Sequence, residues 1–186
     1  MRFRRSLTTF LLLLTGLAAY AQQVPRPAGE FAFKMPNGQV MLLSQYAGKV
    51  VVLAFISTTC PHCQHTTQIL SAIQNEYGPR GVQVLACAFN PDAAQLLPGF
   101  IAQFKPTFPV GSSERESVLE YEQASLVKTN YVPEILFIDR SRTIREQHKG
   151  EDSAFFNDQE KNIRATLDML LKEPVKSARA THKSHS

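Results

Sequence analysis

Two cysteines three residues apart, Cys60 and Cys63, lie where a buried strand gives way to a helix. The residues before them, 50–56, are all apolar and mostly β-branched, which is typical of a central strand covered on both faces. After them, apolar side chains recur at the spacing of an amphipathic helix: Ile69, Leu70, Ile73 and Tyr77. Pro61 fits the first position of that helix. The sequence therefore places both sulfurs at the start of a helix that directly follows a buried strand.

This placement has a chemical consequence for the first sulfur. The unpaired amide N–H groups and the positive dipole end of a helix N-terminus stabilise a thiolate over a thiol at Cys60. Cys63 follows one helical turn later, within reach of a short disulfide with Cys60. The pair has the arrangement of a redox-active dithiol. We expect the Cys60–Cys63 disulfide itself to be the redox group, with no bound cofactor and no metal.

Other interpretations of a CxxC pair fit this sequence less well. A structural zinc ion needs four ligands, and the chain has no second CxxC. A static disulfide is possible in an oxidising compartment, but a bond across three residues closes almost no loop and stabilises little. The third cysteine, Cys87, lies in the apolar run 81–89 and is predicted to be a buried, inert thiol in a second strand.

Further stretches resemble a known family. The strand–CxxC–helix unit, with Tyr131-Val132-Pro133 before the apolar run 135–138, resembles the thioredoxin fold and its cis-proline loop. The segment 27–49 resembles the N-terminal extension of the TlpA-like and peroxiredoxin-like branches, while the dipeptide Pro61-His62 is that of the DsbA oxidases. The resemblance covers about residues 25–171. It implies an α/β, thioredoxin-like fold with a central mixed sheet flanked by helices and an N-terminal β-hairpin, and a thiol–disulfide oxidoreductase.

The resemblance also implies roles for individual residues. Cys60 would form the mixed disulfide with substrate and Cys63 would resolve it. Pro133 would be cis and face the dithiol, exposing the backbone of Val132 to an extended substrate segment. His62, as a cation beside Cys60, would favour the thiolate further; otherwise it is an exposed, inert turn residue. The candidate site residues are Cys60, Pro61, His62, Cys63, Val132 and Pro133.

Departures from the family pattern bear on the direction of electron flow. Ala54 stands where thioredoxin has a buried acidic residue, and Thr66 where some TlpA-like reductases have Glu. Thr59 replaces the aromatic residue that usually precedes the first cysteine. Cys63 therefore lacks its usual carboxylate, which favours an oxidant; the alternative is a TlpA-like reductant of the cytochrome c maturation type. Glu134, where the family often has Thr, either perturbs the site or faces solvent.

Two further functions remain open from the sequence. The cysteines with His62 and His65 could bind Cu(I), as in the Sco-like proteins, although those use CxxxC spacing and only His148 could serve as the distant ligand. A thiol peroxidase is suggested by Ser57-x-x-Cys60, which echoes the peroxiredoxin Thr-x-x-Cys. The proline that peroxiredoxins have seven residues before the cysteine is Leu53 here.

The two ends of the chain differ in composition from its centre. An Arg-rich start, an apolar run shorter than the ~18 residues of a membrane span and a small-x-small site predict a signal peptide over 1–21. A thioredoxin-like domain is expected over 22–173 and a basic, disordered tail over 174–186. Removing 1–21 leaves 17 basic and 16 acidic residues, and the tail carries three of those basic residues. The balanced centre gives no support for nucleic-acid binding.

We therefore expect a periplasmic or secreted protein that does not span the membrane after cleavage. Its partners would be protein thiols and disulfides, together with a separate redox partner that recycles the dithiol.

Secondary structure can be predicted for most of the remaining chain. Alternating apolar residues around Asn37-Gly38 predict a β-hairpin over 31–43. Because proline is unfavourable inside a helix, Pro98 is predicted to begin a short helix that ends at Phe104. A single helix over 155–171 is expected to close the domain.

Overall fold

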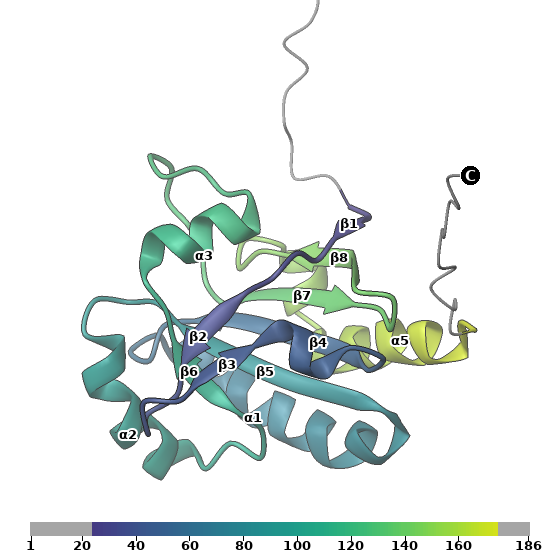
Figure 1. Cartoon of the computed structure of the whole chain (residues 1–186), viewed down its shortest axis with the longest axis horizontal. Helices are drawn as coiled ribbons and strands as arrows, with labels where there is room; N and C mark the ends of the chain where they lie inside the picture. Colours follow the sequence, from purple (N-terminus) through teal and green to yellow (C-terminus); the bar gives the residue numbers. More distant parts are fainter. Residues whose placement is uncertain (1–23, 175–186) are drawn as a thin grey trace, which may run out of the picture.

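The computed structural model describes residues 24–174 (Figure 1). The predicted signal peptide, 1–21, and all but the first residue of the predicted tail lie outside the described residues. In the part of the chain that the structure describes, no helix combines the length and the apolar character needed to cross a bilayer.

A single mixed sheet forms the centre of the molecule. Its strands lie in the order β1-β8-β7-β4-β5-β6-β2-β3, with β4 parallel to β5 and antiparallel to β7. The strands are β1 (Arg26–Pro27), β2 (Ala32–Lys34), β3 (Val40–Leu42), β4 (Val50–Ile56), β5 (Val82–Ala88), β6 (Val110–Ser112), β7 (Glu134–Ile138) and β8 (Thr143–His148). The helices are α1 (Pro61–Tyr77), α2 (Ala93–Phe104), α3 (Arg115–Glu122), α4 (Ser153–Phe156) and α5 (Gln159–Lys172), with single 3₁₀ turns at Leu43–Tyr46 and Gly78–Arg80. The predicted α/β fold is confirmed.

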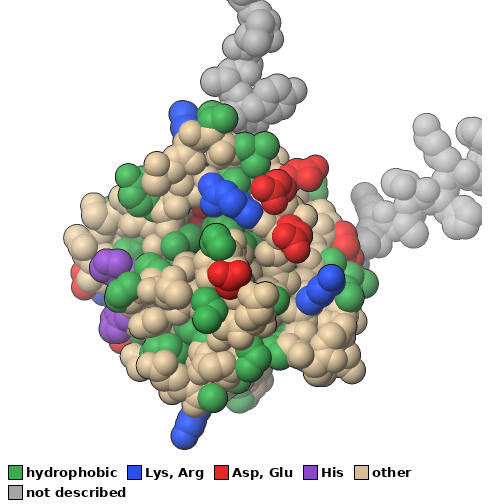
Figure 2. All heavy atoms as spheres, turned by 90° about the vertical axis from the view of Figure 1, so that its left-hand side faces the viewer, with side chains coloured by type: hydrophobic (Ala, Val, Ile, Leu, Met, Phe, Trp, Pro, Cys, Tyr) green, Lys and Arg blue, Asp and Glu red, His purple; other side chains and the backbone are tan. Residues whose placement is uncertain are grey.

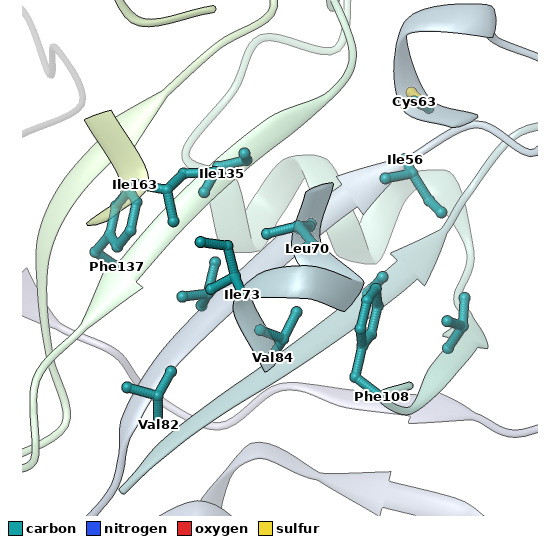
Figure 3. Close-up of a cluster of buried hydrophobic side chains, with 14 of the residues drawn as sticks. Ile56, Cys63, Leu70, Ile73, Val82, Val84, Phe108, Ile135, Phe137 and Ile163 are labelled. Carbon is teal, nitrogen blue, oxygen red and sulfur yellow. The ribbon is translucent and has the colours of Figure 1, made fainter. Parts of the chain in front are cut away.

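The two faces of the sheet are covered by different elements. Because side chains alternate along a strand, Val52, Ala54 and Ile56 of β4 point to one face, while Val51, Leu53 and Phe55 point to the other. The first face packs against α1, α2, α4 and α5; Figure 3 shows Leu70 and Ile73 of α1 among side chains of β5, β7 and α5. The second face packs against α3 and the N-terminal segment. The central strands are therefore buried on both sides, as their continuous apolar runs predict.

The N-terminal hairpin is present as predicted and joins the main sheet. Strands β2 and β3 pair antiparallel around Asn37-Gly38, with Gly38 in the left-handed region (φ 83°) that favours glycine. Lys34 of β2 also pairs with Ser112 of β6, so the hairpin extends the sheet at one edge. At the other edge β1, which was not predicted, pairs with β8.

Two helix predictions are wrong. Helix α2 begins at Ala93, not at Pro98, so the proline lies inside it. The expected single helix over 155–171 is two helices, α4 and α5, separated at Asn157-Asp158. The side-chain amide of Asn162 donates to the carbonyls of Ala154 (3.2 Å) and Phe155 (2.9 Å), which hydrogen-bonds the end of α4 from the side of α5. The apolar spacing continues through the break, which explains why periodicity alone did not reveal it.

Candidate active site

The two cysteines lie at the junction of β4 and α1, as the sequence predicts. Cys60 is the N-cap of α1 in an extended conformation (φ −86°, ψ 121°), and Pro61 occupies the first turn of the helix. The carbonyl of Cys60 accepts the amide N–H of Gln64 at 3.0 Å, which is the first hydrogen bond of the helix. Cys60 therefore stands at the positive end of a helix of 17 residues.

The loop before Cys60 is held by an asparagine from the next strand–helix junction. The amide N–H of Thr58 donates to Oδ1 of Asn90 at 2.9 Å, and the side chain of Gln64 donates to the carbonyl of Thr58 at 3.0 Å. Asn90 is not among the site residues predicted from the sequence. An asparagine directly after a buried strand was the available signal, but nothing local identifies its partner 32 residues away.

The two sulfurs have different surroundings. Cys63 is fully buried, and its Sγ accepts the amide N–H of Ser57 at 3.4 Å. Burial raises the pKa of the Cys63 thiol, against the smaller opposing effect of the Ser57 N–H. Cys60 is partly exposed. An incoming sulfur can therefore reach Cys60 but not Cys63.

The chain brings Val132 and Pro133 to the dithiol from a distant part of the sequence. The Val132–Pro133 peptide bond is cis, as the resemblance implies. Sγ of Cys60 donates to the carbonyl of Val132 at 3.9 Å. Pro133 is buried, whereas Val132 is half-buried and Tyr131 is exposed. The backbone just before the cis-proline thus lies beside the accessible sulfur.

The rim of the site carries Thr59, Pro61 and His62, all exposed. Figure 2 shows one end of the molecule, where hydrophobic side chains are scattered over the surface, acidic and basic side chains gather in the centre and upper part, and two His side chains lie next to each other at the left edge. A substrate that approaches Cys60 meets few charged groups from the CxxC turn itself.

Beneath the dithiol the structure supplies no acidic group at the two positions noted in the sequence. Ala54 is fully buried between Ala86 of β5 and Ile135 of β7. Thr66 is buried too, and its hydroxyl donates to the side-chain oxygen of Gln159 at 2.8 Å. Thr66 and Gln159 therefore occupy the place where some TlpA-like reductases have a carboxylate. Neither a hydroxyl nor a side-chain amide titrates near neutral pH.

Glu134 does not face solvent. It is 3% exposed, and its neighbour in the strand, Ile135, packs on the face that holds Cys63, so the Glu134 side chain points to the opposite face. The side-chain amide of Gln147 donates to its carboxylate and also to the carbonyl of Glu122 (2.9 Å), while Arg26 donates to Gln147 Oε1 (2.8 Å). Sequence reasoning missed this cluster because its members come from four separate elements.

Cys87 is also on that opposite face. It is fully buried among the side chains that pack against α3, and burial raises the pKa of its thiol. The sheet separates it from Cys63, which lies on the other face of the sheet, the one that α1 covers. The prediction that Cys87 is buried is confirmed.

The His148 side chain is engaged by carboxylates: Nδ1 lies 2.8 Å from Asp152 and Nε2 lies 3.1 Å from Glu146. Among residues 24–174, no group of three or more His, Cys, Asp or Glu side chains is arranged to hold a metal ion. The histidine considered as a distant copper ligand, His148, is thus held by Asp152 and Glu146.

A CxxC pair at a strand–helix junction, facing a cis-proline loop in a mixed sheet, defines a thioredoxin-fold thiol–disulfide oxidoreductase. Residues 22–167 match the Redoxin family, and the chain belongs to it. It is 22% identical over 155 residues to the thiol-disulfide oxidoreductase ResA of Bacillus cereus, covering 77% of this chain and 86% of that protein.

Solved structures agree with this assignment. A Chlorobium tepidum protein assigned as thiol:disulfide interchange protein DsbE is 26% identical, with a TM-score of 0.65 over 79% of this chain and 99% of its own. A thiol:disulfide interchange protein of the thioredoxin family from Chlorobium tepidum TLS is 19% identical, with a TM-score of 0.66 over 81% of this chain and 99% of its own. The structure that is 19% identical supports the fold alone, whereas the one that is 26% identical also agrees with the activity.

Proposed function

We propose that the chain acts outside the cytoplasm as an oxidant of protein thiols, through a disulfide between Cys60 and Cys63. The observation that carries the proposal is the contrast between the sulfurs: Cys60 is accessible at a helix N-terminus beside Val132, and Cys63 is buried behind it. Only one sulfur can then form the mixed disulfide with a client.

The exchange requires two client thiols and no further co-reactant. A client thiolate attacks Sγ of Cys60, the Cys60–Cys63 bond breaks, and Cys63 leaves with the electron pair and takes up a proton. The second client thiolate then attacks the client sulfur of the mixed disulfide and releases Cys60 as a thiolate. The client is oxidised by two electrons and the protein is reduced by two. A separate redox partner must restore the disulfide.

Residues around the sulfurs support each step. The helix N-terminus stabilises the departing Cys60 thiolate, and a protonated His62 would add to this effect. An extended client segment can hydrogen-bond to the backbone at Val132 as a short added strand, which brings its cysteine to Cys60. Stabilising the reduced form makes the disulfide a stronger oxidant. The hydroxyl–amide pair Thr66–Gln159 and the apolar Ala54 offer no base to activate Cys63 for reduction.

Trapping tests the roles of the cysteines. We expect Cys60→Ser to abolish exchange, because the accessible sulfur is gone. Cys63→Ser cannot form the internal disulfide, but its Cys60 thiolate should attack a client disulfide, the reverse of the exchange above, and accumulate the mixed disulfide, because Cys63 is no longer present to displace the client sulfur. Denaturing gels followed by peptide mass spectrometry would identify the linkage. Cys87→Ala is the matched control and should exchange like the wild type; a client captured through Cys87 would contradict the assignment.

The reduction potential tests the direction. Equilibration in glutathione buffers should place the wild type closer to DsbA, ~−120 mV, than to thioredoxin, ~−270 mV. His62→Ala should lower the potential by about 30 mV, a tenfold change in the equilibrium constant, because a charge that favours the thiolate is lost. His65→Ala, an exposed histidine further along the same helix, is the control and should leave it unchanged. A wild-type potential near that of thioredoxin, insensitive to His62, would support the TlpA-like reductant instead.

A further inference from the structure

The turn that follows β8, residues 148–152, packs against the backbone of the cis-proline loop. The amide N–H of Gly150 donates to the carbonyl of Tyr131 at 3.4 Å. A Cβ on Gly150 would lie 3.0 Å from the carbonyl carbon and oxygen of Val132 and 3.1 Å from the carbonyl carbon of Tyr131. These contacts are with backbone atoms, which cannot rotate away as a flexible side chain can. A side chain at position 150 would therefore displace the loop.

The need for glycine here comes from contact and not from conformation. Among residues 24–174, the glycines in the left-handed region are Gly29, Gly38, Gly48 and Gly81, and Gly150 is not one of them. The strain of an alanine at this position would therefore come from crowding against the backbone of Tyr131 and Val132. Close contact with the cis-proline loop is thus the reason for glycine at position 150.

His148 fixes the other end of this turn. Its Nδ1 lies 2.8 Å from Oδ2 of Asp152 and closes the turn around Gly150. Its Nε2 lies 3.1 Å from Oε2 of Glu146, so both ring nitrogens are engaged. The ring stacks on Phe155 with centroids 3.8 Å apart and planes 10° from parallel.

The partners of His148 are themselves anchored in the helices. Oδ1 of Asp152 accepts the amide N–H of Phe155 at 3.1 Å and caps α4. Oε2 of Glu146 also accepts the hydroxyl of Thr166 in α5 at 3.0 Å. The turn is therefore hydrogen-bonded to α4 and, through Glu146, to α5. At its centre, Gly150 packs against the backbone of Val132.

We propose that Gly150 and His148 are positioning residues for client binding. The closed turn supports Val132 from behind and holds its carbonyl beside Sγ of Cys60, where the client strand has to dock. The inference rests on the proposed function, in which the client pairs with the backbone at Val132. A small thiol needs only Cys60, whereas a peptide needs both Cys60 and Val132, so the two substrates should respond differently.

Gly150→Ala tests the inference, with Gly99→Ala as the control. Gly99 lies on α2, and a Cβ there meets nothing within 4 Å. With an extended peptide that carries two thiols, we expect Gly150→Ala to lose about tenfold in kcat/KM, mainly through KM, since sub-ångström misplacement of a binding group has effects of this order. The rate with dithiothreitol should stay within about twofold of the wild type. Gly99→Ala should match the wild type with both substrates.

His148→Phe provides a second variant, which keeps a ring to stack on Phe155 but loses both hydrogen bonds. We expect the same rise in KM for the peptide with little change for dithiothreitol. Asp152→Asn keeps an oxygen that can accept the Phe155 N–H and cap α4, and an amide group that can hydrogen-bond to His148. It should therefore retain most of the peptide activity that Asp152→Ala loses. If Gly150→Ala does not fold, Asp152→Asn and Asp152→Ala allow the same comparison of peptide with dithiothreitol.

The outcomes separate the inference from the proposed function. A wild-type protein that exchanges with dithiothreitol but with no peptide dithiol would overturn the proposed function. A wild-type protein that exchanges with the peptide, while Gly150→Ala and His148→Phe behave like Gly99→Ala, would overturn the inference. Equal losses with the peptide and with dithiothreitol would also overturn it, because they indicate general damage to the fold.

Discussion

At the scale of single residues, the carboxyl groups of Glu122 and Glu134 occupy an unusual environment. They are 1% and 3% exposed on the sheet face opposite the dithiol. Burial raises the pKa of Glu134 to about 7; burial, together with the charge of Glu134, raises that of Glu122 to about 9. The folded protein therefore holds protons that the unfolded chain has already released near neutral pH.

This difference predicts that stability falls as the pH rises. Below the ordinary value of 4.5 both states are protonated, and the full contribution of the pair is present. Between that value and about 7 to 9 the unfolded chain binds fewer protons, so the free energy of unfolding decreases by up to about 1.4 kcal/mol per pH unit for each group. Urea unfolding at pH 5, 7 and 9 would measure it. Glu122→Gln and Glu134→Gln should each flatten the dependence.

Glu120→Gln is the matched control, since Glu120 is exposed on the same helix, α3. It should leave the slope unchanged. An equally steep slope in Glu122→Gln, Glu134→Gln and the wild type would exclude the buried pair as its cause.

Which residues the sequence could reveal depends on how local their signals are. Cys60, Cys63 and Pro133 could be predicted because each lies in a short motif next to an apolar run. Asn90 and Gly150 could not, because each acts through one or two contacts with residues far along the chain. Glu134 was expected to perturb the site or face solvent; neither alternative anticipated that Gln147 makes its burial tolerable.

At the scale of elements, Pro98 shows why helix α2 was mispredicted. Proline inside a helix costs ~3 kcal/mol relative to alanine, so the sequence favoured a start at Pro98. The structure accommodates it because Pro98 and Ala94 are both exposed, which leaves the unpaired carbonyl of Ala94 accessible to water. Burial of Ala93, Leu97 and Phe100 holds the helix against the sheet. Packing of this apolar face outweighs the intrinsic preference of one residue.

The proline therefore predicts a stabilising substitution. Pro98→Ala should restore the missing helical hydrogen bond and raise the free energy of unfolding by about 2 kcal/mol, once the greater flexibility of the unfolded chain is subtracted. The urea midpoint should rise without a change in slope. Pro91→Ala, outside the helix and exposed, is the control and should be neutral or slightly destabilising. No gain in Pro98→Ala would mean that the proline is better accommodated than its geometry indicates.

At the scale of the whole molecule, the folded body is defined at its N-terminal edge by β1. Arg26 and Pro27 pair with Ile144 and Thr143 of β8, and the described residues begin at Val24. Cleavage after Ala21 would therefore remove no described strand or helix. The described residues that are buried on the two sheet faces all lie beyond that point.

This arrangement makes processing testable separately from folding. We expect the exported protein to begin at Gln22, because the Arg-rich start, short apolar run and Ala19-Tyr20-Ala21 are typical of a cleaved signal peptide. Mass spectrometry of the periplasmic fraction would identify the N-terminus. A chain expressed from Gln22 should show the same urea midpoint as the processed protein, since every described element that packs in the core is retained. Recovery of full-length chain from the membrane fraction would contradict cleavage, and a lower midpoint for the Gln22 chain would show that the leader contributes to the fold.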